Sequence, residues 1–278
     1  MFYAVDVARK HCVNWHWLLV NAFLGRSGVF TSRADGSIFC DAKTLLRQLM
    51  WLERKWRHHG DVLSVVGFQN HSLVISNYFG KKFMVPLNAY IESPSFLLKQ
   101  HYPFEVLDDV VLDIGAYLGD TPLMWLYKGA RSVIAVEPVP LHFQYLTKNV
   151  AGLPVTCLNV SLAIQLPYVR KEGSIGYGLR LWDEANGHIL NVPVVQLTEL
   201  VERYRPTVVK LDCEGCEHYV RDQLWQLPQF DVKKIAVEFH GIDAYHLNEE
   251  LDFFMEKLGG DYRMWKIGGK YMVYWYRQ

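Results

Sequence analysis

From residue 106 onward, short apolar segments alternate with segments of helical character, and this alternation restricts the fold more than any other feature of the chain. Five segments, the first "DDVVLDIGAY" (108–117) and the last "VKKIAVEFHG" (232–241), have the composition of buried strands. Strands that alternate with helices form a parallel sheet that helices cover on both faces. We therefore predict an α/β fold with a doubly wound, mostly parallel sheet, followed by an antiparallel C-terminal hairpin within 262–277.

The segments between and after the strands supply the predicted helices. Strands are expected within 108–117, 131–139, 153–163, 206–215 and 232–241. Helices are expected within 120–130, 140–152, 192–205, 216–230 and 248–260, with a further strand leading into the third of them.

Residues 1–105 lack this alternation and are predicted to form a small α+β accessory region. Apolar residues at helical spacing predict helices within 11–24 and 40–59. The stretch "SLVISNYFGKKFMVPL" (72–87) predicts a β-hairpin that turns at 77–81. We expect two domains, an accessory region at 1–105 and a ligand-binding α/β domain at 106–278.

Composition and charge narrow the class of partner. The chain carries 29 basic and 29 acidic residues, and this balance disfavours nucleic acid and anionic lipid as partners, although "LERKWRHHG" (52–60) leaves a local basic patch open. We find no signal peptide and no apolar run of the roughly 18 residues that a membrane span needs. We expect a soluble cytoplasmic protein with no membrane partner, and the aromatic terminal hairpin leaves a homodimer open.

The stretch "VVKLDCEGCEHYV" (208–220) contains a C-x-x-C pair, which raises three interpretations. A zinc site needs about four ligands, and the sequence offers no second pair. A redox pair is expected after an early strand, whereas this one follows the fourth strand. An odd total of five cysteines also argues against a disulfide framework. We therefore interpret Cys213 and Cys216 as small apolar residues that pack around a turn, with zinc and redox chemistry as less favoured alternatives.

The residues that follow each strand are the candidates for ligand binding, because ligands bind beyond the carboxyl ends of parallel strands. After the first strand comes "DIGAYLGDT" (113–121), where Gly115 and Gly119 permit a tight turn close to a ligand. Tyr117 stands where the dinucleotide fingerprint requires its second glycine, so the turn is not of that type. Asp113 is suited to an ammonium group rather than to a phosphate.

Two more strand ends extend this binding site. Glu137 follows the second strand, where a carboxylate can accept both hydroxyls of a ribose. Together with the D-x-G-x-x-x-G turn, this glutamate indicates S-adenosylmethionine. Asn159 follows the third strand, where an adenine edge would lie, although a plain turn residue is nearly as good an interpretation.

The last two strand ends bring acids and a histidine together. Asp212 and Glu214 follow the fourth strand, and Glu238 and His240 stand at the end of the fifth. Histidine is the natural general base near neutral pH. We therefore hypothesise that His240 takes a proton from the substrate, or that all four side chains orient the substrate; a purely structural histidine is the alternative.

At this point the sequence resembles a known family. The segment "VVLDIGAYLGDTPLMWLYKGARSVIAVEPVPLHFQYLTKNV" is similar to the cofactor half of class I, Rossmann-like methyltransferases that use S-adenosylmethionine. The blocks "EPVP", "VVKLDCEGCE" and "VEFHG" resemble those of the FkbM methyltransferase family over about residues 106–250. The cysteines fall on variable positions of that pattern, and Tyr117 stands where the family often carries Asn.

The resemblance implies an enzyme that transfers a methyl group to a hydroxyl oxygen of a sugar or small natural product. It implies these cofactor contacts: Asp113, Gly115, Tyr117, Gly119, Asp120, Thr121, Glu137 and Asn159. Mg²⁺ held by two or three of the acidic oxygens is a less favoured alternative. An RNA methyltransferase, an NAD-dependent oxidoreductase and a non-catalytic cofactor-binding module are the rival hypotheses.

Overall fold

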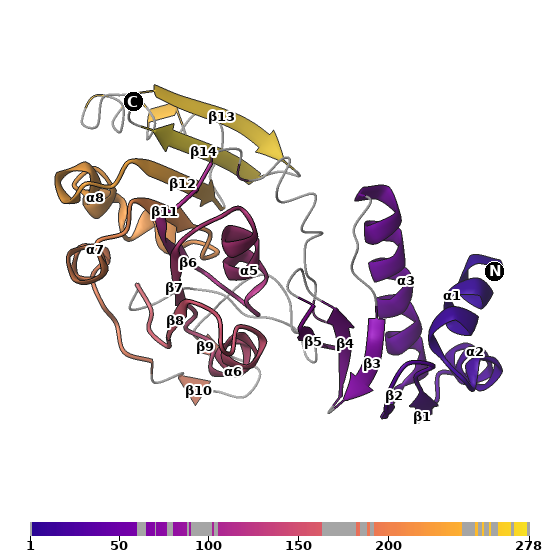
Figure 1. Cartoon of the computed structure of the whole chain (residues 1–278). Coiled ribbons are helices and arrows are strands. Elements are labelled where there is room, and N and C mark those ends of the chain that lie inside the picture. The colour runs from indigo at the N-terminus through magenta and orange to yellow at the C-terminus, as the bar shows by residue number, and fades with distance from the viewer. Residues whose placement is uncertain are drawn as a thin grey trace. The chain divides into compact units, whose positions relative to one another are not determined.

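The computed structural model divides into two compact units near residue 100, and each is considered by itself (Figure 1). The structure describes residues 2–59, 65–69, 71–76, 80–87, 89, 102, 105–162, 182–183, 188–189, 192–240, 248–249, 252, 256, 261–267 and 270–276. None of the helices found among these residues has the length and apolar character needed to cross a membrane.

The first unit combines three helices with two small antiparallel sheets. The helices are α1 (Phe2–His11), α2 (Trp15–Leu24) and α3 (Ala42–His59). One sheet pairs β1 (Ser27–Thr31) with β2 (Ser37–Asp41), and the other has the order β3 (Val65–Gln69), β4 (Ser72–Ser76), β5 (Lys82–Pro86). The three helices pack on one another around fully buried side chains such as Leu18, Leu45 and Leu49.

The structure refines the predictions for this unit. The predicted hairpin is confirmed, since Ser76 of β4 pairs with Lys82 of β5. The segment 11–24 is not one helix, because α1 ends at His11 and α2 begins at Trp15. The β1–β2 hairpin and β3 were not predicted.

The second unit is built on a seven-stranded sheet with the order β13-β14-β12-β11-β6-β7-β8. The five strands from β12 to β8 are parallel. The remaining two strands are antiparallel to their neighbours, β14 to β12 and β13 to β14. Their bounds are β6 Val110–Ile114, β7 Ser132–Val136, β8 Val155–Leu158, β11 Val208–Leu211, β12 Lys234–Phe239, β13 Asp261–Ile267 and β14 Lys270–Tyr276. The predicted doubly wound, mostly parallel sheet with a terminal hairpin is confirmed.

Helices cover both faces of this sheet, as the alternation of strand side chains requires. Leu112 and Ile114 of β6 pack in one core with α7 (Leu197–Tyr204) and α8 (Arg221–Leu224). The helix α5 (Asp120–Tyr127) contacts β6 and β7, and α6 (Pro140–Asn149) contacts β8. A two-residue pair, β9 (Trp182–Asp183) with β10 (His188–Ile189), completes the described elements apart from two 3-10 turns.

Three segments differ from their predictions or lie outside the described residues. The helix predicted at 216–230 is three short pieces: the 3-10 turn η2 (Cys216–His218), α8, and the 3-10 turn η3 (Leu227–Phe230). The strand predicted before α7 is reduced to one isolated bridge between Ser161 and Val194. Most of the helix predicted at 248–260 lies outside the described residues.

The direction of the chain reverses at β6. From β6 the chain proceeds to β7 and then β8 on one side, and it returns to pair β11 on the other side of β6. Such a switch point opens a crevice beyond the carboxyl ends of the two strands. Here β6 and β11 are in register, with Lys210 opposite Asp113.

Candidate active site

The turn after β6 passes close to the end of β11, and its glycines make this approach possible. Gly115 and Gly119 have φ values of +81° and +96°, in the left-handed region that favours glycine. A Cβ on Gly115 would lie 1.8 Å from the carbonyl oxygen of Asp212. Tyr117 also has a positive φ of +49°. The first position of the turn, Gly115, therefore needs a glycine, because any side chain would clash with the neighbouring backbone.

Glu137 joins this turn to the next strand end. Its carboxylate accepts hydrogen bonds from the backbone N–H of Tyr117 and of Val139, both at 2.9 Å, and it is almost fully buried. His142 Nδ1 lies 3.5 Å from the same carboxylate. A carboxylate offers about four acceptor positions, so these contacts leave capacity for a ribose hydroxyl.

Asn159 fixes the β7 end from the neighbouring strand. Its side-chain amide donates to the carbonyl oxygens of Glu137 and Pro138, at 2.8 and 3.1 Å. The predicted adenine contact would therefore have to use the side-chain oxygen of Asn159. At the start of α5, the buried Thr121 Oγ1 has no hydrogen-bond partner among the described residues. An unpaired buried hydroxyl beside a glycine turn fits a site that a polar ligand completes.

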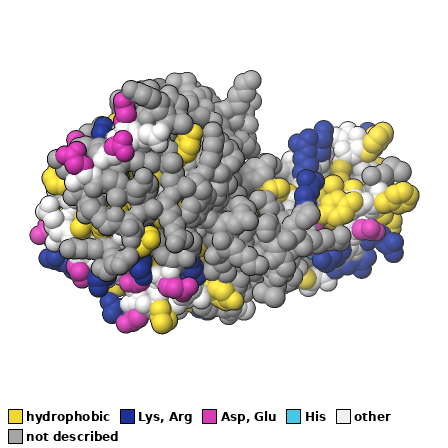
Figure 2. All heavy atoms as spheres, turned by 90° about the horizontal axis from the view of Figure 1, so that it is seen from above, with side chains coloured by type: hydrophobic (Ala, Val, Ile, Leu, Met, Phe, Trp, Pro, Cys, Tyr) yellow, Lys and Arg dark blue, Asp and Glu magenta, His cyan; other side chains and the backbone are white. Residues whose placement is uncertain are grey.

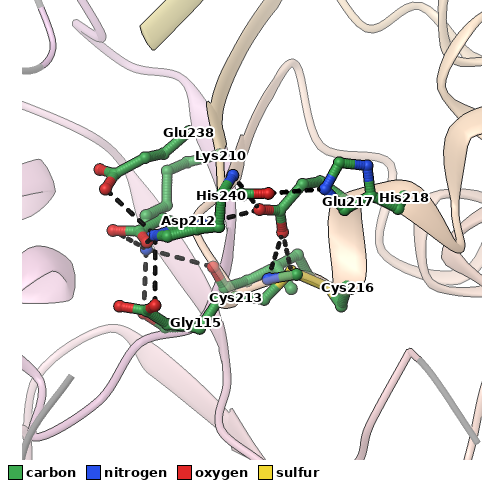
Figure 3. A network of polar contacts seen from close by, with 12 residues as sticks. Gly115, Lys210, Asp212, Cys213, Cys216, Glu217, His218, Glu238 and His240 are labelled. Atoms are coloured by element: carbon green, nitrogen blue, oxygen red, sulfur yellow. Dashed lines mark hydrogen bonds and ion pairs between the residues drawn. A yellow bond between two sulfur atoms is a disulfide. The ribbon is translucent and has the colours of Figure 1, made fainter. Parts of the chain in front are cut away.

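Lys210 is a residue that the sequence analysis did not select. Its side chain is completely buried, and Nζ donates to the carbonyl oxygens of Ile114 and Gly115 at 3.1 and 2.9 Å (Figure 3). The same Nζ lies 3.1 Å from Asp113 Oδ1 and 3.8 Å from Asp212 Oδ2. The structure thus pairs Asp113 with an ammonium group of the chain itself.

Four carboxylates surround His240 at the carboxyl ends of β11 and β12. Nδ1 of His240 lies 2.6 Å from Glu217 Oε1, and Nε2 lies 3.2 Å from Glu238 Oε1 (Figure 3). Glu214 and Asp212 follow at 3.4 and 3.8 Å from Nε2. The structure therefore brings together all four residues that were predicted on this side of the site.

Glu217 is the second residue that the sequence analysis did not select. It is completely buried, and its Oε1 accepts from the backbone N–H of His240 as well as contacting the ring. Its Oε2 accepts from the N–H of Gly215 and lies 3.2 Å from Cys213 Sγ. Glu217 therefore connects the β11 turn to the end of β12.

The carboxylates determine the charge of His240. Burial alone would lower the pKa of its imidazole, but hydrogen bonds to Glu217 and Glu238 and the charges of Asp212 and Glu217 raise this pKa to about 10. At neutral pH the ring is therefore an imidazolium. A protonated ring has a donor on both nitrogens, which matches the carboxylates that lie on its two sides.

The two cysteines of the C-x-x-C pair form a disulfide, which corrects their interpretation as separate apolar residues. Cys213 and Cys216 are joined at their sulfur atoms, and their Cα atoms lie 5.4 Å apart. Both are buried against the sheet core. The turn through Glu214 and Gly215, both with positive φ, brings the two cysteines together. The described free thiols are Cys12, Cys40 and Cys157.

The acidic cluster also has the composition of a metal site. Asp212, Glu238 and His240 each place one possible ligand atom within 4.8 Å of the others. Two of these three ligand atoms are carboxylate oxygens, the kind that Mg²⁺ prefers, and the third is an imidazole nitrogen.

Comparison with known proteins gives one family. Residues 113–263 match the methyltransferase FkbM domain. None of the curated proteins compared with the chain matches it.

The chain also matches solved structures at low identity, and the names of two of the three described below are those of methyltransferases. A putative SAM-dependent methyltransferase from Streptococcus mutans is 8% identical, with a TM-score of 0.48, and 89% of this chain and 71% of that one are covered. The methyltransferase FkbM from Methylobacillus flagellatus is 14% identical, with a TM-score of 0.43, and 66% and 50% are covered. TYW2 from P. horikoshii, in complex with MeSAdo, is 13% identical, with a TM-score of 0.45, and 74% and 70% are covered.

Proposed function

Because this chain belongs to the FkbM family of S-adenosylmethionine-dependent methyltransferases, we propose that it methylates a hydroxyl oxygen of a sugar or another small natural product. One observation carries the proposal: the carboxylates around His240 lie beside the glycine turn, at the crevice of the sheet. Asp212 connects the two parts, since its carboxylate lies 3.8 Å from both Lys210 Nζ and His240 Nε2. A hydroxyl bound there would meet a hydrogen-bond acceptor next to the cofactor site.

The proposed cofactor contacts are those nearest the turn. S-adenosylmethionine supplies a methyl group on a sulfonium, which leaves as a neutral thioether. Glycine backbone, the Thr121 hydroxyl and the Glu137 carboxylate are suited to hold it, and Tyr117, Asp120 and Asn159 complete the proposed set. Residues 1–105 are the proposed accessory region and residues 106–278 the proposed catalytic domain. The division of the chain into two compact units near residue 100 supports this proposal.

We assign the acceptor side to Asp212. Its side chain is 27% exposed, more than those of Glu214, Glu238 and Glu217, so it is the carboxylate that an acceptor can reach most readily. Asp212 would accept the hydroxyl proton as the oxygen bonds to the methyl carbon. The cations of Lys210 and His240 on either side would hold this carboxylate in place, and positioning supplies most of the remaining rate enhancement.

The test is methyl transfer from labelled S-adenosylmethionine to fractionated cell extract. We expect label in neutral small molecules, and loss of most of that label with Asp212→Asn while affinity for S-adenosylhomocysteine is retained. Ser37→Ala, a change in the first unit, is the control and should leave transfer unchanged. Label found only in RNA would contradict the proposed acceptor. Binding of NAD in place of S-adenosylhomocysteine would contradict the proposed cofactor site.

RNA remains the second candidate acceptor because of the charge of the first unit. Residues 1–100 contain twelve Lys and Arg against six Asp and Glu, a net charge of +6 that the zero total conceals. The surface of this unit shows basic and hydrophobic side chains together (Figure 2), and Trp17 and Phe23 of α2 are exposed. Basic and aromatic groups together suit single-stranded RNA. A salt-dependent RNA shift assay decides: retention of RNA that weakens steeply with salt would favour this acceptor.

A further inference from the structure

Lys210 lies in the middle of the sheet where a charged side chain is least expected. Its strand β11 is buried along its whole length, with parallel neighbours β6 and β12 on either side. A buried ammonium costs several kcal/mol unless charges and hydrogen bonds offset the loss of water. The chain provides one carboxylate and two carbonyl oxygens within 3.1 Å of Nζ.

These contacts keep the side chain charged. Burial alone would lower the pKa of Lys210, but the charges of Asp113 and Asp212 raise it above its usual value. These contacts favour the charged form of the amine at the crevice. The ammonium counterbalances Asp113, whose side chain is also completely buried.

The two carbonyl oxygens that Lys210 contacts belong to the start of the cofactor turn. Ile114 is the last residue of β6, and Gly115 is the glycine that touches the backbone of Asp212. Without the cation, two carbonyl oxygens and a carboxylate would face one another with no positive charge between them. Lys210 therefore sets where the turn leaves the sheet.

Any second cation beside Asp113 would lie close to the ammonium of Lys210, which is 3.1 Å from Asp113 Oδ1. Asp113 is the residue whose sequence position suggested an ammonium partner, and the ammonium of Lys210 already occupies that place. Two like charges that lie this close in a buried site repel each other. The ammonium of a bound cofactor would meet this repulsion next to Lys210.

We propose that Lys210 is the positioning residue of the cofactor turn, and that Asp113 acts on cofactor binding only through Lys210. The inference rests on the proposed cofactor site and specifies how that site is held. The backbone N–H of Tyr117 in the same turn donates a hydrogen bond to Glu137. A displaced turn would therefore affect the part of the site proposed for the ribose as well as the part proposed for the amino-acid group of the cofactor.

Calorimetry with two ligands tests the proposal. S-adenosylhomocysteine carries the ammonium group, and 5′-methylthioadenosine lacks the entire amino-acid part. We expect Asp113→Asn to weaken both ligands by a similar factor, about 10-fold or more, as expected when a buried charge loses its partner. Weakening of S-adenosylhomocysteine alone would show that Asp113 contacts the cofactor ammonium directly, and would overturn the proposal.

A double variant makes the test independent of the size of the effect. Lys210→Met should also weaken the binding of both ligands. Adding Asp113→Asn to this variant should weaken binding no further, because Asp113 acts only through Lys210. A further loss specific to S-adenosylhomocysteine in the double variant would overturn the proposal. If Lys210→Met does not fold, the two-ligand comparison on Asp113→Asn decides alone.

The second unit offers a matched control pair. Lys234 of β12 lies 2.7 Å from Asp109, just before β6, and both positions are at the opposite ends of these strands from the turn. Lys234→Met should reduce stability and leave both affinities unchanged; a similar loss of affinity would show that Lys210 acts only through stability, and would overturn the proposal. If the unmodified protein does not bind S-adenosylhomocysteine, the proposed cofactor site is wrong, and this inference is wrong with it.

Discussion

At the scale of single residues, the site is a set of charges that depend on one another. Lys210 and His240 are cations with little exposure to water, and carboxylates surround both. Glu217 holds the ring of His240 from one side while Glu238 approaches from the other. The functional groups are therefore positioned mainly by electrostatics, and changes in protonation should be measurable as changes in stability.

The raised pKa of His240 predicts a specific dependence of stability on pH. The pKa of an unfolded histidine is near 6.5, so the contribution of His240 is fully present below that pH and is lost as pH rises through about 10. Each pKa unit corresponds to about 1.4 kcal/mol, which gives an upper bound of roughly 5 kcal/mol. Urea unfolding of the wild type and of His240→Gln at pH 6, 8 and 10 measures the contribution of His240 to the free energy of unfolding. A difference between the two that does not shrink toward pH 10 would contradict the assignment.

The close approach of Gly115 predicts a large effect of a single methyl group. Gly115→Ala should destabilise the protein by roughly 2–5 kcal/mol, because backbone strain and a clash with the Asp212 carbonyl add together. Gly25→Ala is the matched control: its φ is +64°, and a Cβ there meets nothing within 4 Å. That variant should cost only about 1 kcal/mol of strain. Equal losses in chemical unfolding would show that the contact with Asp212 has no effect.

At the scale of elements, the sequence predicted the sheet better than the segments that connect it. The five parallel strands of the second unit are apolar runs, and each lies in the segment predicted for it, whereas the strand predicted before α7 is only an isolated bridge. The segment 216–230 was predicted as one helix from its apolar spacing, but it forms three pieces, and Pro228 at the start of η3 has no N–H to continue the hydrogen bonds of α8. The acids of the site followed from their positions after strands.

The partners of those acids could not be predicted in the same way. Lys210 was visible as a charged residue inside the apolar run "VVKL", and this is the signal that could have identified it. The contact of Glu217 with His240 joins residues that are 23 positions apart, which no local pattern encodes. The disulfide depended on the backbone of the turn rather than on the spacing of its cysteines.

The disulfide predicts a thiol count and a modest loss on reduction. Titration of thiols in the denatured, unreduced protein should find three, those of Cys12, Cys40 and Cys157. Reduction should cost roughly 2 kcal/mol or less, because the closed loop is very short. Cys213→Ala combined with Cys216→Ala is the control, since a reductant should have no further effect on its unfolding. A count of five thiols would contradict the disulfide.

At the scale of the whole molecule, two units with separate cores and opposite charge share one chain. The twelve basic residues of the first hundred positions leave the remainder with 17 against 23 acidic residues, a net charge of −6. The cofactor turn and the acidic cluster both belong to the second unit. A change in the core of the first unit should therefore leave cofactor binding intact.

A pair of core substitutions tests this separation. Leu49 of α3 and Leu211 of β11 are both completely buried, one in each unit. Each Leu→Ala change should cost about 2–5 kcal/mol of local stability. Calorimetry should find that only Leu211→Ala weakens S-adenosylhomocysteine, since Leu211 directly precedes Asp212. Equal weakening by Leu49→Ala would show that the units are coupled in binding.

The position of β14 has a consequence for synthesis. This strand follows β13 in the chain but inserts between β13 and β12 in the sheet. A ribosome releases β13 first, so β13 must wait without its partner until residues 270–276 emerge from the exit tunnel. The nascent chain therefore carries unpaired edges on β12 and β13 until residues 270–276 emerge, and a chaperone that shields such edges would have its main opportunity during that interval.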